Sequence, residues 1–182
     1  MAEKLVGLVK QSYSAISKTS PIIEEVKYNA QKLIRLTSRR EQVLEQLIEL
    51  AKPLPEYVIL LSIPGIAETT GTSVIGELGD IRRFTSANQI NAFIGIDLKH
   101  YESGDFLGQE HITKRGNPYA RKILYKCIHN IASASHTNLF HISDFYEKRK
   151  RQSQTTSTKP HTIASIHRLI RTMYYLIMHN EL

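Results

Sequence analysis

Apolar residues recur at alternating spacings of three and four between residues 20 and 54, which is the periodicity of a helix with one apolar stripe. Ser20 and Pro21 are typical of a helix start, because serine caps a first turn and proline fits its first position. Thr37 and Arg40 place one polar layer in the stripe. The stripe itself consists of Ile23, Val26, Ala30, Leu33, Leu44, Leu47 and Ala51. We predict a coiled-coil-like helix through which copies of the chain associate, although one amphipathic helix packed on its own domain fits the same pattern.

Residues 55–182 contain the helix-start and helix-end residues that are typical of a compact helical domain. Residues 1–19 are weakly patterned and form a lead-in. Glycines 79 and 95 are typical of helix ends, and Asn117 followed by proline is typical of a helix start. Residues 96–112 lose helical periodicity and contain β-forming residues, so we expect an irregular loop or a small β-hairpin there. The predicted fold class is mainly α: a long coiled-coil-like helix, then a helical domain with a helix-hairpin-helix element and this small insertion.

Positive charge is concentrated in the last third of the chain. The net charge is +7, and residues 111–182 carry twelve basic and three acidic side chains, whereas residues 61–110 carry three and seven. Such a basic block is typical of a phosphate-binding surface, although surplus positive charge also keeps many proteins soluble. The run Lys148-Arg149-Lys150-Arg151 fits either a nucleic-acid patch or a solvated helix end.

The remaining composition indicates a protein of a reducing compartment. Cys127 is the single cysteine, so an intrachain disulfide is excluded. No apolar run is long enough to span a membrane, and the first residues lack the pattern of a signal peptide. The histidines and carboxylates show no metal-ligand spacing. We therefore expect a cytoplasmic protein with no membrane partner and no metal site or cofactor on this chain.

The segment Ile63-Pro64-Gly65-Ile66 matches the core of a helix-hairpin-helix element, in which a tight apolar turn joins two short helices. Exposed backbone N–H groups at such a turn bind phosphate without reading sequence. We predict that role for Gly65 and Ile66, although Ala67 stands where a second glycine is usual and restricts the backbone. An ordinary turn between two helices is the alternative.

A second candidate site runs from Ser103-Gly104 to the block Lys114-Arg115-Gly116-Asn117. A serine attacks a phosphodiester when its hydroxyl is exposed, a base is near and cations stabilise the phosphate. Glycine beside it allows close approach of the substrate backbone. Taken alone the signal is weak, because Ser-Gly is foremost a turn dipeptide.

Several blocks, in this order and at close spacing, make a more specific pattern. The blocks are Ile63-Pro64-Gly65-Ile66, Gly76-Glu77-Leu78-Gly79-Asp80-Ile81, Arg83-Phe84, Phe93-Ile94-Gly95-Ile96, Ser103-Gly104 and Ile112-Thr113-Lys114-Arg115-Gly116-Asn117. With them the sequence resembles the C-terminal domain of the bridge-RNA-guided DEDD insertion-sequence transposases (the IS110 family), densely from about residue 55 to 125 and more loosely to the final helix.

The resemblance implies that Ser103 is the nucleophile that becomes joined to DNA. It also implies that the block at 114–117 lies beside the nucleic acid, with DNA and a guide RNA as partners. The expected nucleic-acid contacts in and after this block are Lys114, Arg115, Asn117, Arg121 and Lys122.

Members of that family carry an N-terminal ribonuclease-H-like domain whose four acidic residues bind magnesium, and we expect this chain to begin too late to contain it. As a fragment or a truncated reading frame, it is expected to bind nucleic acid better than it performs transposition. A non-catalytic nucleic-acid-binding module and a coiled-coil interaction module are the alternatives. Only the interaction module predicts no salt-dependent affinity for DNA.

Overall fold

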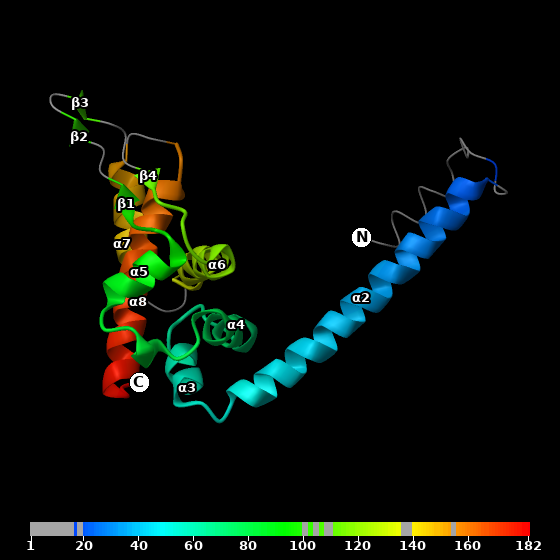
Figure 1. Cartoon of the computed structure of the whole chain (residues 1–182), viewed down its shortest axis with the longest axis horizontal. Coiled ribbons are helices and arrows are strands. Elements are labelled where there is room, and N and C mark those ends of the chain that lie inside the picture. Colours follow the sequence, from blue (N-terminus) through cyan, green and yellow to red (C-terminus); the bar gives the residue numbers. More distant parts are fainter. Residues whose placement is uncertain are drawn as a thin grey trace. The chain divides into compact units, whose positions relative to one another are not determined.

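The computed structural model describes residues 20–99, 102–103, 106–107, 111–135, 140–153 and 156–182, together with Ser17. Within these residues the fold is mainly α-helical, which confirms the predicted class (Figure 1). The chain divides into two compact units, residues 1–44 and residues 45–182. The predicted lead-in lies almost entirely outside the described residues.

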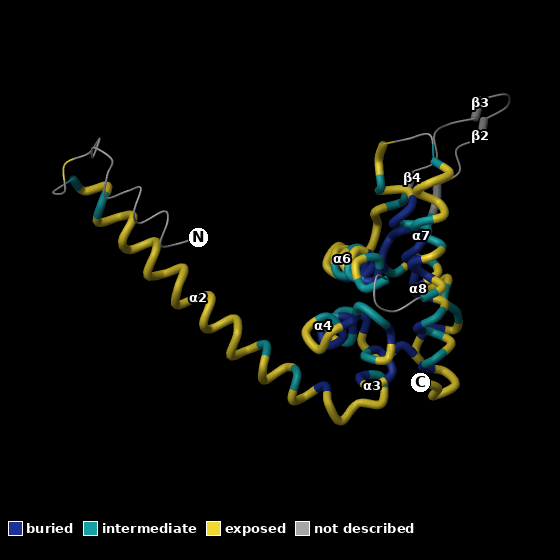
Figure 2. Tube along the Cα trace, turned by 180° about the vertical axis from the view of Figure 1, so that it is seen from behind, coloured by how far each residue is buried: buried dark blue, intermediate teal, exposed yellow. Residues whose placement is uncertain are grey.

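The helix α2 (Pro21–Ala51) begins at the predicted proline and crosses the boundary between the two units. Almost its whole length is exposed, and Ala51 is its one buried residue (Figure 2). The predicted stripe is therefore largely uncovered, with Val26, Leu33 and Leu47 exposed to solvent. An apolar stripe of this length in water is typical of a helix that lacks its packing partner.

The second unit is built from helices of 7 to 21 residues, a short 3-10 helix and a small β insertion. Its elements in chain order are α3 (Pro55–Leu61), α4 (Glu68–Leu78), η1 (Ile81–Arg83), α5 (Ala87–Ile94), β1 (Leu98–Lys99), β2 (Glu102–Ser103), β3 (Phe106–Leu107), β4 (His111–Ile112), α6 (Pro118–Ala134), α7 (His141–Gln152) and α8 (Lys159–His179).

Local chemistry fixes most of these boundaries. Pro55 opens α3, and Gly79 with a φ of 64° ends α4. Ser86 precedes α5 without a side-chain cap, and Gln89 Oε1 instead accepts from the N–H of Thr85 at 2.9 Å. A left-handed Gly95 ends α5, as the sequence predicts.

The core of the second unit lies around α8, which packs against α3, α5, α6, α7 and η1 (Figure 1). Most of the apolar face of α8 is buried, although Ile163 is only half-buried. The buried face of α8 includes Ile166, Leu169, Ile170, Met173 and Ile177. The helix α7 begins at His141.

Residues 98–112 form two short antiparallel pairs, which we call the arm. In one pair Leu98 is opposite Ile112, and in the other Ser103 is opposite Phe106. The chain thus leaves the end of α5, passes through β1 and β2, and returns through β3 and β4 toward α6 (Figure 1). This arrangement realises the predicted small insertion.

Candidate nucleic-acid interface

The segment after β4, residues 113–117, is bonded to the C-terminal end of α5 and the residues that follow it, and we call it the strap. Its backbone N–H groups donate from Thr113 to the carbonyl of Asp97 (2.8 Å), from Lys114 to that of Gly95 (2.9 Å) and from Asn117 to that of Phe93 (2.9 Å). Three backbone hydrogen bonds across five residues thus fix the position of the strap against the end of α5. The block that the sequence singles out is therefore an ordered part of the fold.

Two glycines make this close contact possible. A Cβ on Gly95, which has a φ of 72°, would lie 2.7 Å from the carbonyl oxygen of Arg115. A Cβ on Gly116, which has a φ of 150°, would lie 2.8 Å from the backbone nitrogen of Gly95 and closer still to the carbonyl oxygen of Phe93. Both positions combine a positive φ with backbone neighbours that cannot move aside, so each requires glycine.

Asn117 joins the strap to two helices. Its Oδ1 accepts from the N–H groups of Tyr119 (2.9 Å) and Ala120 (3.1 Å), which caps the start of α6. Its Nδ2 donates to Oε2 of Glu77 on α4 (2.8 Å). The Asn117 side chain thus has a structural role in the fold, and a contact with nucleic acid stays a prediction.

Arg121 also has a partner inside the fold. Its Nη1 donates to the carbonyl of Ile94 at 2.7 Å, which satisfies an orphan carbonyl at the C-terminal end of α5. The predicted phosphate contact of Arg121 therefore competes with this cap and stays a prediction.

Three of the predicted cationic contacts are exposed around the start of α6: Lys114, Arg115 and Lys122. None of them forms an ion pair with another residue that the structure describes. The first turn of α6 contains no acidic residue, so the positive end of the helix dipole adds to their field. The ring of Tyr119 lies at the same helix start and is 69 % exposed. A phosphate group would be stabilised at this surface.

The structure places Ser103 in β2, on the arm that joins α5 to the strap. Gly104 lies outside the described residues, as does Tyr101 at the start of the same motif. The backbone of Ser103 pairs with that of Phe106 in an antiparallel ladder. The strap directly follows β4, so the predicted nucleophile and the predicted cations lie on successive segments of the chain.

His167 on α8 contacts the base of the arm. Burial lowers the pKa of His167, while the carboxylate of Asp97 and a hydrogen bond with the backbone of Ile96 oppose that shift, and the charge of Arg171 adds to the lowering. Ile96 and Asp97 directly precede β1, so α8 supports the point at which the arm leaves the fold. No local pattern in the sequence predicts this contact.

The predicted phosphate-binding turn at Gly65 and Ile66 packs inside the fold. Gly65 has a φ of 88°, and a Cβ there would lie 2.7 Å from the backbone nitrogen and Cα of Ile131 on α6. The side chain of Ile66 is buried, and its N–H donates to the carbonyl of Ile63 (3.0 Å). The turn thus joins α3 and α4 to α6, and this geometry disfavours the predicted phosphate contact through the Ile66 N–H.

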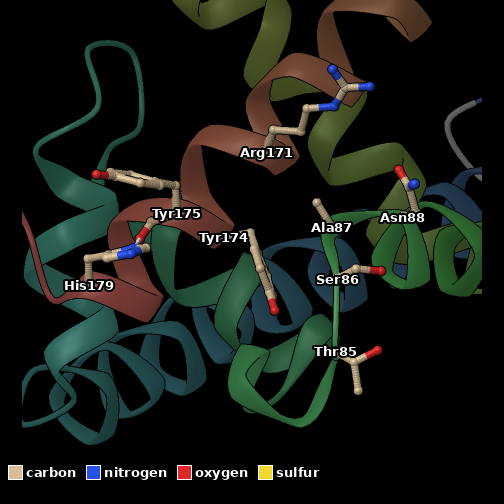
Figure 3. Close-up of a pocket in the computed structure, with 8 residues that line it drawn as sticks. All are labelled: Thr85, Ser86, Ala87, Asn88, Arg171, Tyr174, Tyr175 and His179. Atoms are coloured by element: carbon tan, nitrogen blue, oxygen red, sulfur yellow. Dashed lines mark hydrogen bonds between the residues drawn. The ribbon is translucent and has the colours of Figure 1, made fainter.

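A shallow groove of about 420 Å³ lies between the start of α5 and the last turns of α8 (Figure 3). Tyr174 donates its hydroxyl to the carbonyl of Phe84 (3.1 Å), so its ring is anchored in the fold. Tyr175 is exposed and stacks on His179 with 4.2 Å between ring centroids. Of the two tyrosines, only Tyr175 presents an exposed ring.

Other kinds of site find no support in the described part of the chain. It contains no group of three or more histidine, cysteine, aspartate or glutamate side chains that could hold a metal ion. Cys127 is buried, and burial raises the pKa of its thiol to about 12, so it is no nucleophile at neutral pH. Among the described helices, none combines the length and the apolar character needed to span a membrane.

The profile of the Transposase IS116/IS110/IS902 family matches residues 57–147, which is 91 of the 182 residues. The matched range contains α5, the arm, the strap and α6. The chain therefore belongs to this transposase family.

Curated relatives agree with that assignment. The chain is 36% identical over 80 residues to the transposase for insertion sequence element IS1111A of Coxiella burnetii, covering 44% of this chain and 22% of that protein. It is 29% identical over 106 residues to the transposase for insertion sequence element IS1328 of Yersinia enterocolitica, covering 52% and 32%. It is 31% identical over 65 residues to a probable family 20 transposase of Pseudomonas aeruginosa, covering 36% and 19%. The matched part is thus a third or less of each relative's length.

Proposed function

We propose that this chain is part of an insertion-sequence transposase that acts on DNA, and that the strap and the start of α6 contact nucleic-acid phosphates. The observation that carries this proposal is the set of exposed cations Lys114, Arg115 and Lys122 at the positive end of α6, without ion-pair partners among the described residues. They lie within the range that matches the transposase family. Lys126 is exposed one turn further along α6 and extends the same surface.

Ser103 is the proposed nucleophile. Its Oγ would bond to phosphorus while a P–O bond of the DNA backbone breaks. The hydroxyl proton passes to a base, and the departing oxygen takes the bonding electrons and gains a proton. The resemblance of the surrounding blocks and the hairpin position of Ser103 support this assignment. Strap cations beside the arm supply the positive field that such a phosphate needs.

The proposal also includes a guide RNA and a separate acidic domain that binds magnesium, as the family resemblance implies. The described residues of this chain do not fit a magnesium site. No step on this chain is therefore assigned to the metal, and the chain alone is expected to bind nucleic acid without completing transposition.

DNA affinity should depend on the strap cations and on salt. We expect the Lys114→Ala, Arg115→Ala double variant to bind duplexes of unrelated sequence more weakly by a similar factor. The slope of log affinity against log salt should become shallower by about 2, because two phosphate contacts no longer release counterions. Fluorescence anisotropy between about 50 and about 200 mM salt measures both quantities.

The matched control is a Lys27→Ala, Lys52→Ala double variant, which removes the same charge from two lysines already paired with glutamates three residues away. This control should keep the parent slope. An identical slope in the strap variant would remove Lys114 and Arg115 from the phosphate path.

We further propose that α2 joins copies of the chain through its apolar stripe. Leu33 lies in the stripe and Tyr28 lies on the opposite side of the helix, and their side chains are similarly exposed at 67% and 62%. A coiled coil would bury Leu33 and leave Tyr28 in water.

Sedimentation should therefore show self-association that Leu33→Glu weakens by about tenfold or more, because a buried carboxylate without a partner is costly. The control Tyr28→Glu should associate like the parent chain. A monomeric parent chain, or equal effects of the two substitutions, would exclude association through the apolar stripe.

A further inference from the structure

A second polar hollow lies where α7 ends and α8 begins. Its volume is about 360 Å³, and its lining residues are Arg149, Gln152, Ser153 and His161. The helices α7 and α8 pack against each other, so the hollow is built between two ordered elements (Figure 1). It is formed by residues outside the strap, the arm and α6.

His161 has an unusual environment in this hollow. Its side chain is only 7 % exposed, and neither ring nitrogen has a hydrogen-bond partner among the described residues. A buried polar group without a partner is destabilising. The same side chain lines the hollow.

The charges around the hollow favour an anion. Arg149 is exposed in the last turn of α7, and Lys150 and Arg151 lie beside it. His161 lies in the first turn of α8, where N–H groups have no partner within the helix and Thr158 provides no side-chain cap. Glu147 directly precedes this run and pairs with Lys150 at 3.8 Å, and from residue 148 to the C-terminus the single acidic side chain is Glu181.

Helix electrostatics alone do not account for this arrangement. A basic run at the end of α7 compensates the negative end of the helix dipole. This compensation explains Lys150 and Arg151 as well as anion binding does. It does not explain why a histidine with two unpartnered nitrogens is buried against the same hollow as Arg149. An acceptor that binds both an imidazole N–H and a guanidinium explains both.

We infer that this hollow binds a phosphate group of a nucleic-acid strand, through the Arg149 guanidinium and a ring N–H of His161. Gln152 adds an amide donor. A phosphate matches these groups because its oxygens accept several charge-assisted hydrogen bonds at once. The inference rests on the nucleic-acid-binding function proposed above and adds a contact separate from the strap.

The test follows the imidazole resonances of His161 by NMR in the full chain during titration with inorganic phosphate, and then during competition by a short single-stranded oligonucleotide. We expect saturable shifts, displacement of phosphate by the oligonucleotide, and an affinity about tenfold lower in Arg149→Ala. Arg151→Ala removes the same charge from the same run but not from the hollow, and it should stay within about twofold of the parent. His161→Gln, which keeps a side-chain N–H donor, should retain more phosphate affinity than His161→Leu.

Three results would overturn the inference. They are an absence of shifts at His161, equal losses in Arg149→Ala and Arg151→Ala, and phosphate binding that no oligonucleotide displaces, which would indicate a free-anion site. The Lys114→Ala, Arg115→Ala variant should bind inorganic phosphate at His161 as the parent does. Failure of the strap proposal is therefore distinguishable from failure at this hollow.

Discussion

Replacing Gly116 with alanine should destabilise the second unit by about 3 kcal/mol, which is a large effect for one added methyl group. The new Cβ would meet the backbone of Phe93 and Gly95, neither of which can rotate away. The backbone at Gly116 also has a φ of 150°, which side chains rarely adopt. Relief requires the strap to separate from α5. Thermal unfolding followed by circular dichroism should show a melting temperature lower by about 10 °C.

Gly76→Ala is the matched control for this prediction. Gly76 lies inside α4 and is exposed, and a Cβ added there would meet nothing within 4 Å. Alanine there should stabilise the helix by about 0.5–1 kcal/mol, because glycine loses more backbone freedom on folding. Equal melting temperatures for Gly116→Ala and the parent would show that the strap contact does not require glycine.

Replacing Ser103 with alanine should abolish covalent attachment to DNA while leaving the fold intact. The assay joins this segment to an intact acidic domain of the family and supplies RNA and donor DNA. Loss of the single attacking oxygen should reduce adduct formation by about a thousandfold or more, because no other group replaces a covalent nucleophile. Salt-dependent binding should remain, since the strap cations are unchanged.

Ser73→Ala is the control for removal of a hydroxyl elsewhere. The hydroxyl of Ser73 donates to the carbonyl of Thr69 within α4 and lies on a different element. The Ser73→Ala variant should form adducts like the parent. Undiminished adduct formation in Ser103→Ala would leave the chain as a nucleic-acid-binding module without a nucleophile.

Helix boundaries could be predicted because their causes are local. Proline at 21, 55 and 118 opens helices, and a left-handed glycine ends α5, each through the backbone preferences of that residue. Asn117 is predictable as a helix start because its side-chain oxygen can accept from the N–H groups of the first turn. The arm could be placed by its loss of helical periodicity, but its pairing register could not.

The contacts that position the site could not be predicted because they join distant parts of the chain. The bond from Asn117 to Glu77 spans 40 residues, and that from Arg121 to Ile94 spans 27. The sequence indicates cations before and within α6. Only the fold shows that Lys114 and Lys122 are exposed while Arg121 caps the end of α5. Likewise, Gly65 has the signature of a phosphate-binding turn, while the structure packs it against α6.

The most direct test of the proposed chemistry is to identify the residue that carries DNA in the covalent adduct. Nuclease and protease digestion of the adduct, followed by mass spectrometry, locates the remaining nucleotide on one peptide. The nucleotide should be attached to Ser103, on the arm between α5 and the strap. A nucleotide on any other side chain of this segment would contradict the assignment of Ser103 as nucleophile.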